Sequence, residues 1–126
     1  MKADFKTAGT LAYDNLYAGE TSRVTEKLVI AEGAGDLKRG AVLAANSAGK
    51  YVLVDTDAGD PGDIRRTPYA VLAHDADATS DDIEAMAYLS GHFNELALTF
   101  GGTDDADDHR AKLRELGIFL SKNMGA

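Results

Sequence analysis

Short apolar runs separated by polar turns dominate the pattern of this 126-residue chain. The runs at residues 69–73 and 83–89 flank a polar segment, residues 74–82, that is rich in Asp, Ser and Thr. Two runs of strand length around such a segment predict a strand pair whose side chains enter one core. The stretch 68–94, which contains both runs, is therefore predicted to organise the fold.

Further strand-sized runs occur before and after this stretch. They are residues 26–31, 41–45, 50–55 and 94–100. Turn-forming segments rich in Gly, Asp or Asn separate several of these runs, namely residues 32–36, 46–49 and 57–63. Short strands at regular spacing predict a compact β-barrel or a sandwich.

One helix is predicted near the end of the chain, where Thr103 or Asp104 can cap its N-terminus. Acidic residues in the first turn suit the helix dipole, and these are Asp105, Asp107 and Asp108. Apolar residues at helical spacing share one face, and these are Ala106, Leu113 and Leu116. Gly117 is placed to end the helix, and residues 118–120 then form a last strand or a packed tail.

Residues 1–25 show no sustained period of 2 or 3.6, yet they carry several large apolar side chains. These are Phe5, Leu11, Tyr13, Leu16 and Tyr17. The segment is either a frayed terminus with scattered aromatics or an arm that orders on a partner. The predicted fold class is thus α+β and strand-dominated, with a compact domain at 26–126, one C-terminal helix and a flexible N-terminal arm at 1–25.

The composition narrows the choice of partners and compartment. The formal net charge is −8, with 21 acidic against 13 basic residues, which argues against nucleic-acid binding because phosphates are neutralised by Lys and Arg. The chain has no Cys, so it can fold in a reducing cytoplasm. No apolar run approaches the ~20 residues of a membrane span, and no membrane partner is expected.

The densest group of potentially catalytic residues is His74, Asp75 and Asp77, with His92 further along the chain. Imidazole and carboxylate groups are the ligands and bases of a small metal-dependent hydrolase. In a strand, however, His74, Asp75 and Asp77 would not all share one face, and Asp–Thr clusters are typical of turns. We therefore keep the hydrolase as an alternative and favour turn chemistry.

Two other groups favour structure over chemistry. The sequence around Ser90 lacks the G-x-S-x-G pattern of a nucleophile elbow. Asp105 and His109, four residues apart, can share a divalent ion, but stabilisation of the helix N-terminus already explains the acidic cluster. No catalytic residue, metal site or cofactor is predicted.

Four segments follow one another in a recognisable order. Residues 37–44 with 49–54 read LKRGAVLA and GKYVLV, and residues 68–79 read PYAVLAHDADAT. Residues 88–100 carry the pattern Y-x-x-G-x-F-N, and residues 113–120 carry L-x-x-L-G-I-x-L. Together these segments resemble the lambda-type bacteriophage head decoration protein family.

The resemblance implies a structural virion protein without enzyme activity. It implies a homotrimer that binds the phage major capsid protein on the outer surface of the expanded capsid, at three-fold positions, and stabilises the shell against internal DNA pressure. Residues 1–25 would be the capsid-binding arm, anchored by the five apolar side chains named above, and 26–126 the decoration domain. A barrel domain of a larger cellular complex is a further alternative, although the Met-Lys-Met site of biotinyl carriers is absent.

Overall fold

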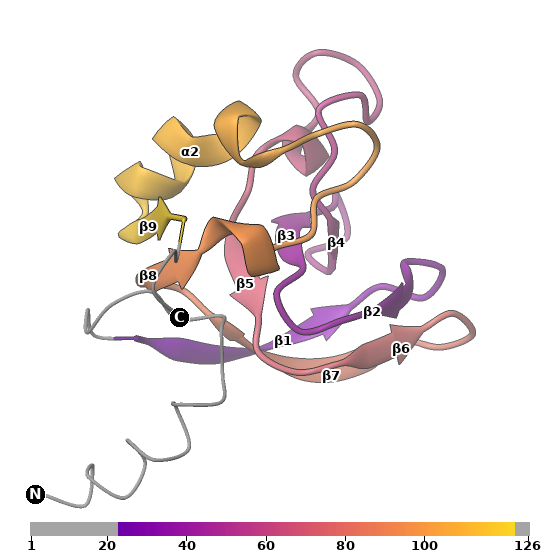
Figure 1. The fold of residues 1–126 in the computed structure, drawn as a ribbon. Coiled ribbons are helices and arrows are strands. Elements are labelled where there is room, and N and C mark those ends of the chain that lie inside the picture. The colour runs from indigo at the N-terminus through magenta and orange to yellow at the C-terminus, as the bar shows by residue number, and fades with distance from the viewer. Residues whose placement is uncertain (1–22, 123–126) are drawn as a thin grey trace, which may run out of the picture.

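The computed structural model describes residues 23–122 and shows a strand-dominated domain with one α-helix in that range (Figure 1). The strands are β1 (Thr25–Ile30), β2 (Gly35–Leu37), β3 (Val42–Ala45), β4 (Tyr51–Leu53), β5 (Ala70–Leu72), β6 (Ala76–Ala78), β7 (Ile83–Tyr88), β8 (Gly91–Asn94) and β9 (Ile118–Ser121). The helices are α2 (Ala106–Glu115) and two short 3-10 helices, η1 (Ile64–Arg66) and η2 (Glu95–Ala97). None of the helices within 23–122 is long and apolar enough to cross a membrane.

Five strands close into a barrel in the order β1-β4-β3-β5-β7. Strand β7 returns to β1 along its whole length, from Thr25 opposite Tyr88 to Ile30 opposite Ile83. Strands β5 and β7 are antiparallel, with Leu72 opposite Ala87. The strand pair predicted from residues 69–73 and 83–89, and the barrel itself, are thus confirmed.

Strands β1 and β7 bury one face only. Leu28 and Ile30 point into the barrel opposite Ala85 and Ile83, whereas Lys27 and Glu84 on the outer face form an exposed ion pair at 3.7 Å. Alternation of apolar and polar residues is what an antiparallel sheet with one solvated face requires.

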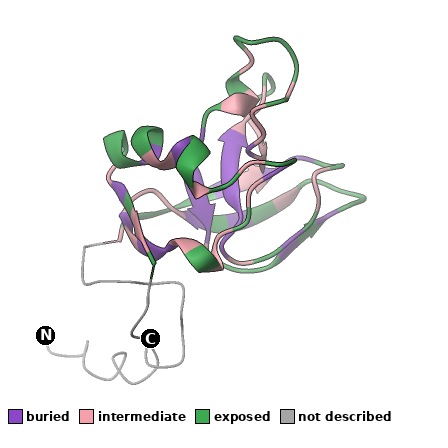
Figure 2. Ribbon diagram, turned by 45° about the horizontal axis from the view of Figure 1, so that its top comes forward, coloured by how far each residue is buried: buried purple, intermediate pink, exposed green. Residues whose placement is uncertain are grey.

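Strands β3 and β5 bury both faces. Leu43, Ala70 and Leu72 belong to the barrel core, whereas Val42, Ala44 and Val71 belong to a second core outside the barrel. An outer layer of α2, β8 and β9 completes that second core with three fully buried side chains, which are Phe93, Leu113 and Ile118. Figure 2 shows the central strands as buried, with exposed loops around them.

The segment 74–82 is not purely a turn, because β6 lies within it and pairs with β2. Strand β2 begins at Gly35, inside the predicted turn 32–36. Leu37, Ala76 and Ala78 are buried against the barrel core, while Asp36 and Asp77 lie opposite each other on the exposed side. In strands of only three residues, the alternation of apolar and polar residues is too short to recognise, and Gly and Asp are also typical of turns.

The predicted strand at 94–100 is wrong. Asn94 ends β8, and its side chain accepts a hydrogen bond from the backbone N–H of Leu96 at 3.0 Å, which caps η2. Local side-chain bonds of this kind compete with sheet ladders. Sheet pairing resumes only as an isolated bridge between Ala41 and Thr99.

Helix α2 begins one or two residues later than predicted, since Thr103 and Asp104 are the expected caps. Asp105 is the N-cap, and it forms a capping box with Asp108, whose carboxylate accepts the Asp105 backbone N–H at 2.8 Å. Gly117, with φ +89°, ends the helix as predicted. Leu116 is 40% exposed and does not join the buried face, where His109 stands beside Leu113.

Asp104 enters the protein instead of capping the helix. Its Oδ2 lies 2.8 Å from Nε2 of His109, and its Oδ1 accepts the Thr56 hydroxyl at 2.6 Å. The Asp104 and His109 side chains are 1% and 2% exposed. Burial works to raise the pKa of Asp104, but the bonds from Thr56 and His109 outweigh it and hold the pKa below its usual value. This network ties α2 to the loop after β4.

We predict that Leu72→Ala lowers the free energy of unfolding by about 2–5 kcal/mol, because the Leu72 side chain is fully buried in the barrel and its removal opens a cavity. Chemical denaturation at equilibrium measures the change. The matched control is Leu96→Ala, since Leu96 is 66% exposed and should change stability by less than about 0.5 kcal/mol. Equal effects at the two positions would contradict the placement of the core.

We predict that Asp104→Asn lowers the free energy of unfolding by about 1–3 kcal/mol at pH 7. A carboxyl whose pKa is lowered on folding stabilises the protein above its unfolded pKa of about 4, and this contribution disappears as the pH falls through the folded value. The loss should therefore shrink below about pH 4 in a denaturation series across pH. Asp60→Asn, at an exposed aspartate, is the control; a loss independent of pH would argue against an ionised Asp104.

Candidate functional site

The four residues of the hydrolase alternative have separate structural partners. Nε2 of His74 accepts the backbone N–H of Met86 at 3.0 Å. Oδ1 of Asp75 accepts the backbone N–H of Arg39 at 2.9 Å. These bonds hold the loop between β5 and β6 against its neighbours, so both side chains act as turn and edge groups.

The other two members lie elsewhere. Asp77 accepts the Thr79 hydroxyl and the Thr79 backbone N–H, and the hydroxyl is the main reason that the pKa of Asp77 is lowered. His92, on β8, has Nε2 2.9 Å from Oγ of Ser121 on β9. Within residues 23–122, no group of three or more His, Asp or Glu side chains could hold a metal ion.

The predicted pair of Asp105 and His109 does not share a site either. Asp105 uses its carboxylate on the backbone N–H groups of Asp107 and Asp108, at the start of α2. His109 turns inward to Asp104. Asp105 in the acidic cluster therefore caps the helix, and Asp104 links the helix to the protein interior through His109. Both roles agree with the structural interpretation of the sequence.

The five predicted arm anchors (Phe5, Leu11, Tyr13, Leu16 and Tyr17) lie outside the described residues. The structure does describe Arg23 and Val24, near the end of the predicted arm 1–25, and we call these two residues the arm root. The Val24 carbonyl accepts the backbone N–H of Leu89 at 2.6 Å, and the Val24 N–H donates to Oγ of Ser90 at 3.2 Å. This arm root is thus fixed to the turn between β7 and β8.

Gly91 allows the close approach at this point. Its φ is +147°, and a Cβ there would lie 2.8 Å from the Phe93 ring and 3.0 Å from Cγ of Arg23. Its N–H donates to the Gly117 carbonyl at 3.0 Å, and β8 then runs parallel to β9 with Gly91 opposite Ile118. The arm root therefore adjoins the start of β9, at the end of α2 (Figure 1).

A shallow hollow of about 230 Å³ lies between α2 and β9. We call four of the residues that line it, Arg110, Arg114, Phe119 and Leu120, the β9 surface. Phe119 is 40% exposed, because it points away from the core that holds Ile118. Sequence reasoning missed this surface by treating 118–120 as one apolar run, although alternation in a strand would have turned Phe119 outward.

Two carboxylates hold the Arg110 side chain at the edge of the hollow. It donates to Oε1 of Glu95 at 2.9 Å, to Oε2 of Glu95 at 3.1 Å and to Oδ1 of Asp107 at 2.9 Å. The bond to Glu95 is the main cause of a pKa for Arg110 above its usual value. Glu95 is only 9% exposed, so this two-pronged pair anchors α2 to η2.

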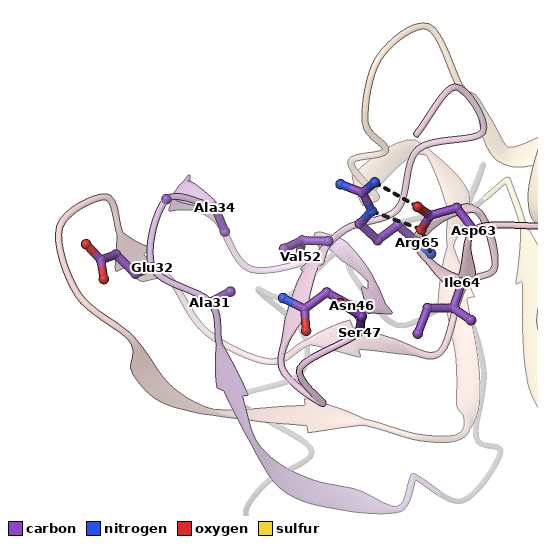
Figure 3. A pocket seen from close by; sticks show the side chains of 10 residues that line it. Ala31, Glu32, Ala34, Asn46, Ser47, Val52, Asp63, Ile64 and Arg65 are labelled. Atoms are coloured by element: carbon purple, nitrogen blue, oxygen red, sulfur yellow. Dashed lines mark hydrogen bonds and ion pairs between the residues drawn. The ribbon is translucent and has the colours of Figure 1, made fainter. Parts of the chain in front are cut away.

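A second, more polar cleft of about 620 Å³ lies between the β1–β2 turn, the β3–β4 hairpin and η1 (Figure 3). Asp63 and Arg65 face each other there, with two side-chain bonds of 2.9 and 2.7 Å. The Arg65 side chain is the main cause of the lowered pKa of Asp63, about 2. The opposite charges of Asp63 and Arg65 cancel, and their bonds stabilise η1. Ile64, between them in sequence, is 50% exposed.

Comparison with known proteins assigns the chain to a family. The sequence model described as bacteriophage lambda head decoration protein D matches residues 6–119, which include most of the predicted arm 1–25 and nearly all of the described residues 23–122. A search of curated protein sequences found no match. The chain therefore belongs to the bacteriophage lambda head decoration protein D family, whose role is structural and lies in the phage capsid.

Proposed function

We propose that this protein is a homotrimeric decoration protein that binds the outer surface of an expanded phage capsid at three-fold positions. There it stabilises the shell against the pressure of packaged DNA. The family match over residues 6–119 carries the proposal, because it extends through the arm as well as the barrel. The partner is the major capsid protein.

The arm supplies the contact with the shell in this proposal. Residues 1–22 precede the fixed root at Arg23 and include the anchors Phe5, Leu11, Tyr13, Leu16 and Tyr17. An extended segment can add a strand to the edge of a partner's sheet and place alternate side chains in pockets. Ordering a segment costs roughly 1–2 kcal/mol per residue, so a single arm binds weakly.

Three arms on one rigid trimer overcome this weakness. Linked binding events raise overall affinity by roughly 10²–10⁴-fold without new contacts, provided that all arms can engage together. The firm attachment of Val24 to the β7–β8 turn suits this requirement, because it fixes the point from which each arm starts. A three-fold site on the shell then presents matching positions for all three arms.

No second function is advanced. The four residues of the hydrolase alternative are each engaged with separate structural partners within 23–122, and no observation favours catalysis.

We predict that deletion of residues 1–20 leaves a folded domain that no longer protects expanded heads against heat or osmotic shock. Binding to heads that lack decoration protein should fall by at least about 100-fold, because three arms are lost together. Sedimentation of heads with labelled protein measures binding, and circular dichroism checks that the domain is folded. Binding by the truncated protein as tight as that of the full chain would overturn the role of the arm.

We predict that the free protein has three times the mass of the 13.3 kDa chain. Sedimentation equilibrium over a range of concentrations measures this mass directly. A stable trimer is expected because avidity requires the three arms to be joined before they meet the shell. A monomer at the concentrations that saturate heads would contradict the proposal.

A further inference from the structure

We propose that the β9 surface is a second contact with the phage shell, made by the folded domain next to the arm root. This inference rests on the proposed function. Its partner is an acidic and apolar region of the major capsid protein, close to the place where the arm binds.

The chemistry of the β9 surface is that of an interface. Phe119 is 40% exposed, and Arg114 lines the same hollow without an ion pair to any residue in 23–122. Aromatic and Arg side chains are enriched among the residues that dominate binding energy. On a chain of net charge −8, an unpaired Arg beside an exposed Phe suits a carboxylate next to an apolar pocket.

The surface is also prepared before binding. Ile118 is fully buried and fixes β9 in the second core, so the outward position of Phe119 is set by the fold. The bonds of Arg110 to Glu95 and Asp107 fix the opposite side of the hollow. A surface held in its bound shape loses little conformational entropy on association.

The position of the arm root selects the shell over a second copy as the occupant. Tyr17 lies six residues before Arg23, which is a reach of roughly 20 Å for an extended chain. If Tyr17 is anchored on the shell, Arg23 therefore lies within roughly 20 Å of that anchor. Arg23 lies so near Gly91 that a Cβ at Gly91 would be 3.0 Å from Cγ of Arg23, and Gly91 pairs with Ile118, so β9 is brought to the same place.

The test uses the full-length protein with Phe119→Asp and, separately, Arg114→Glu. Each should weaken binding to expanded heads lacking decoration protein by about ten-fold or more, since each removes an anchor of the contact. Solution mass and the unfolding midpoint should stay unchanged, because both side chains point to solvent. The matched control is Ile64→Asp, at a residue 50% exposed in the cleft of Figure 3, which should bind as the parent protein does.

The outcomes separate this inference from the proposed function when the protein lacking residues 1–20 is tested in parallel. If arm deletion abolishes binding while Phe119→Asp and Arg114→Glu bind normally, the second contact is overturned and the arm stands. If arm deletion has no effect, the proposed function itself fails. If Phe119→Asp or Arg114→Glu separates the copies from one another, the β9 surface joins copies and the inference is overturned. Should Phe119→Asp fail to fold, Arg114→Glu at the exposed helix end decides alone.

Discussion

Burial of β3 and β5 on both faces is the constraint on which the rest of this structure depends. A barrel strand with one solvated face needs alternating residues, but Val42–Ala45 and Ala70–Leu72 are apolar throughout. Their outward side chains, such as Val71, must be covered, and the layer of α2, β8 and β9 covers them. That layer then adds a second core, built around Phe93, to a barrel that is small on its own.

This outer layer links the core to the part of the molecule that we propose contacts the shell. Strand β8 follows β7 after a two-residue turn, and the same turn receives the arm root at Val24. Strand β9 is held beside β8 and carries Phe119 on its open side. The proposed contacts with the shell therefore start from β8 and β9, which complete the second core. A force applied to the arm would then act on the packed side chains of that core.

The sequence predicted those parts of the fold whose apolar pattern reflects burial directly. The barrel strands β1, β3, β4, β5 and β7, the helix and its stop at Gly117 all follow from such patterns. Strands β2 and β6 escaped prediction because three residues with Gly and Asp look like a turn. The segment 94–100 misled because Asn94 diverts the backbone into η2. Leu116 misled because it is the C-cap of α2, where the chain leaves the helix at Gly117.

The proposed contact surface was harder to predict than the fold. His74, Asp75 and Asp77 are close in sequence, yet they and His92 each bind a different structural partner. The order of the motifs in the sequence indicated the family. The match of the family model to residues 6–119 shows that the chain belongs to it. The β9 surface needed the three-dimensional structure, because only packing of Ile118 inward reveals that Phe119 and Arg114 border one hollow.

Electron cryo-microscopy of expanded phage heads saturated with this protein tests the central claim most directly. The account predicts three copies of the barrel around each three-fold position on the outer surface, with density for the residues before Arg23 continuing into the shell. Density on the inner surface, at other symmetry positions, or with the chain before Arg23 directed away from the shell would contradict it.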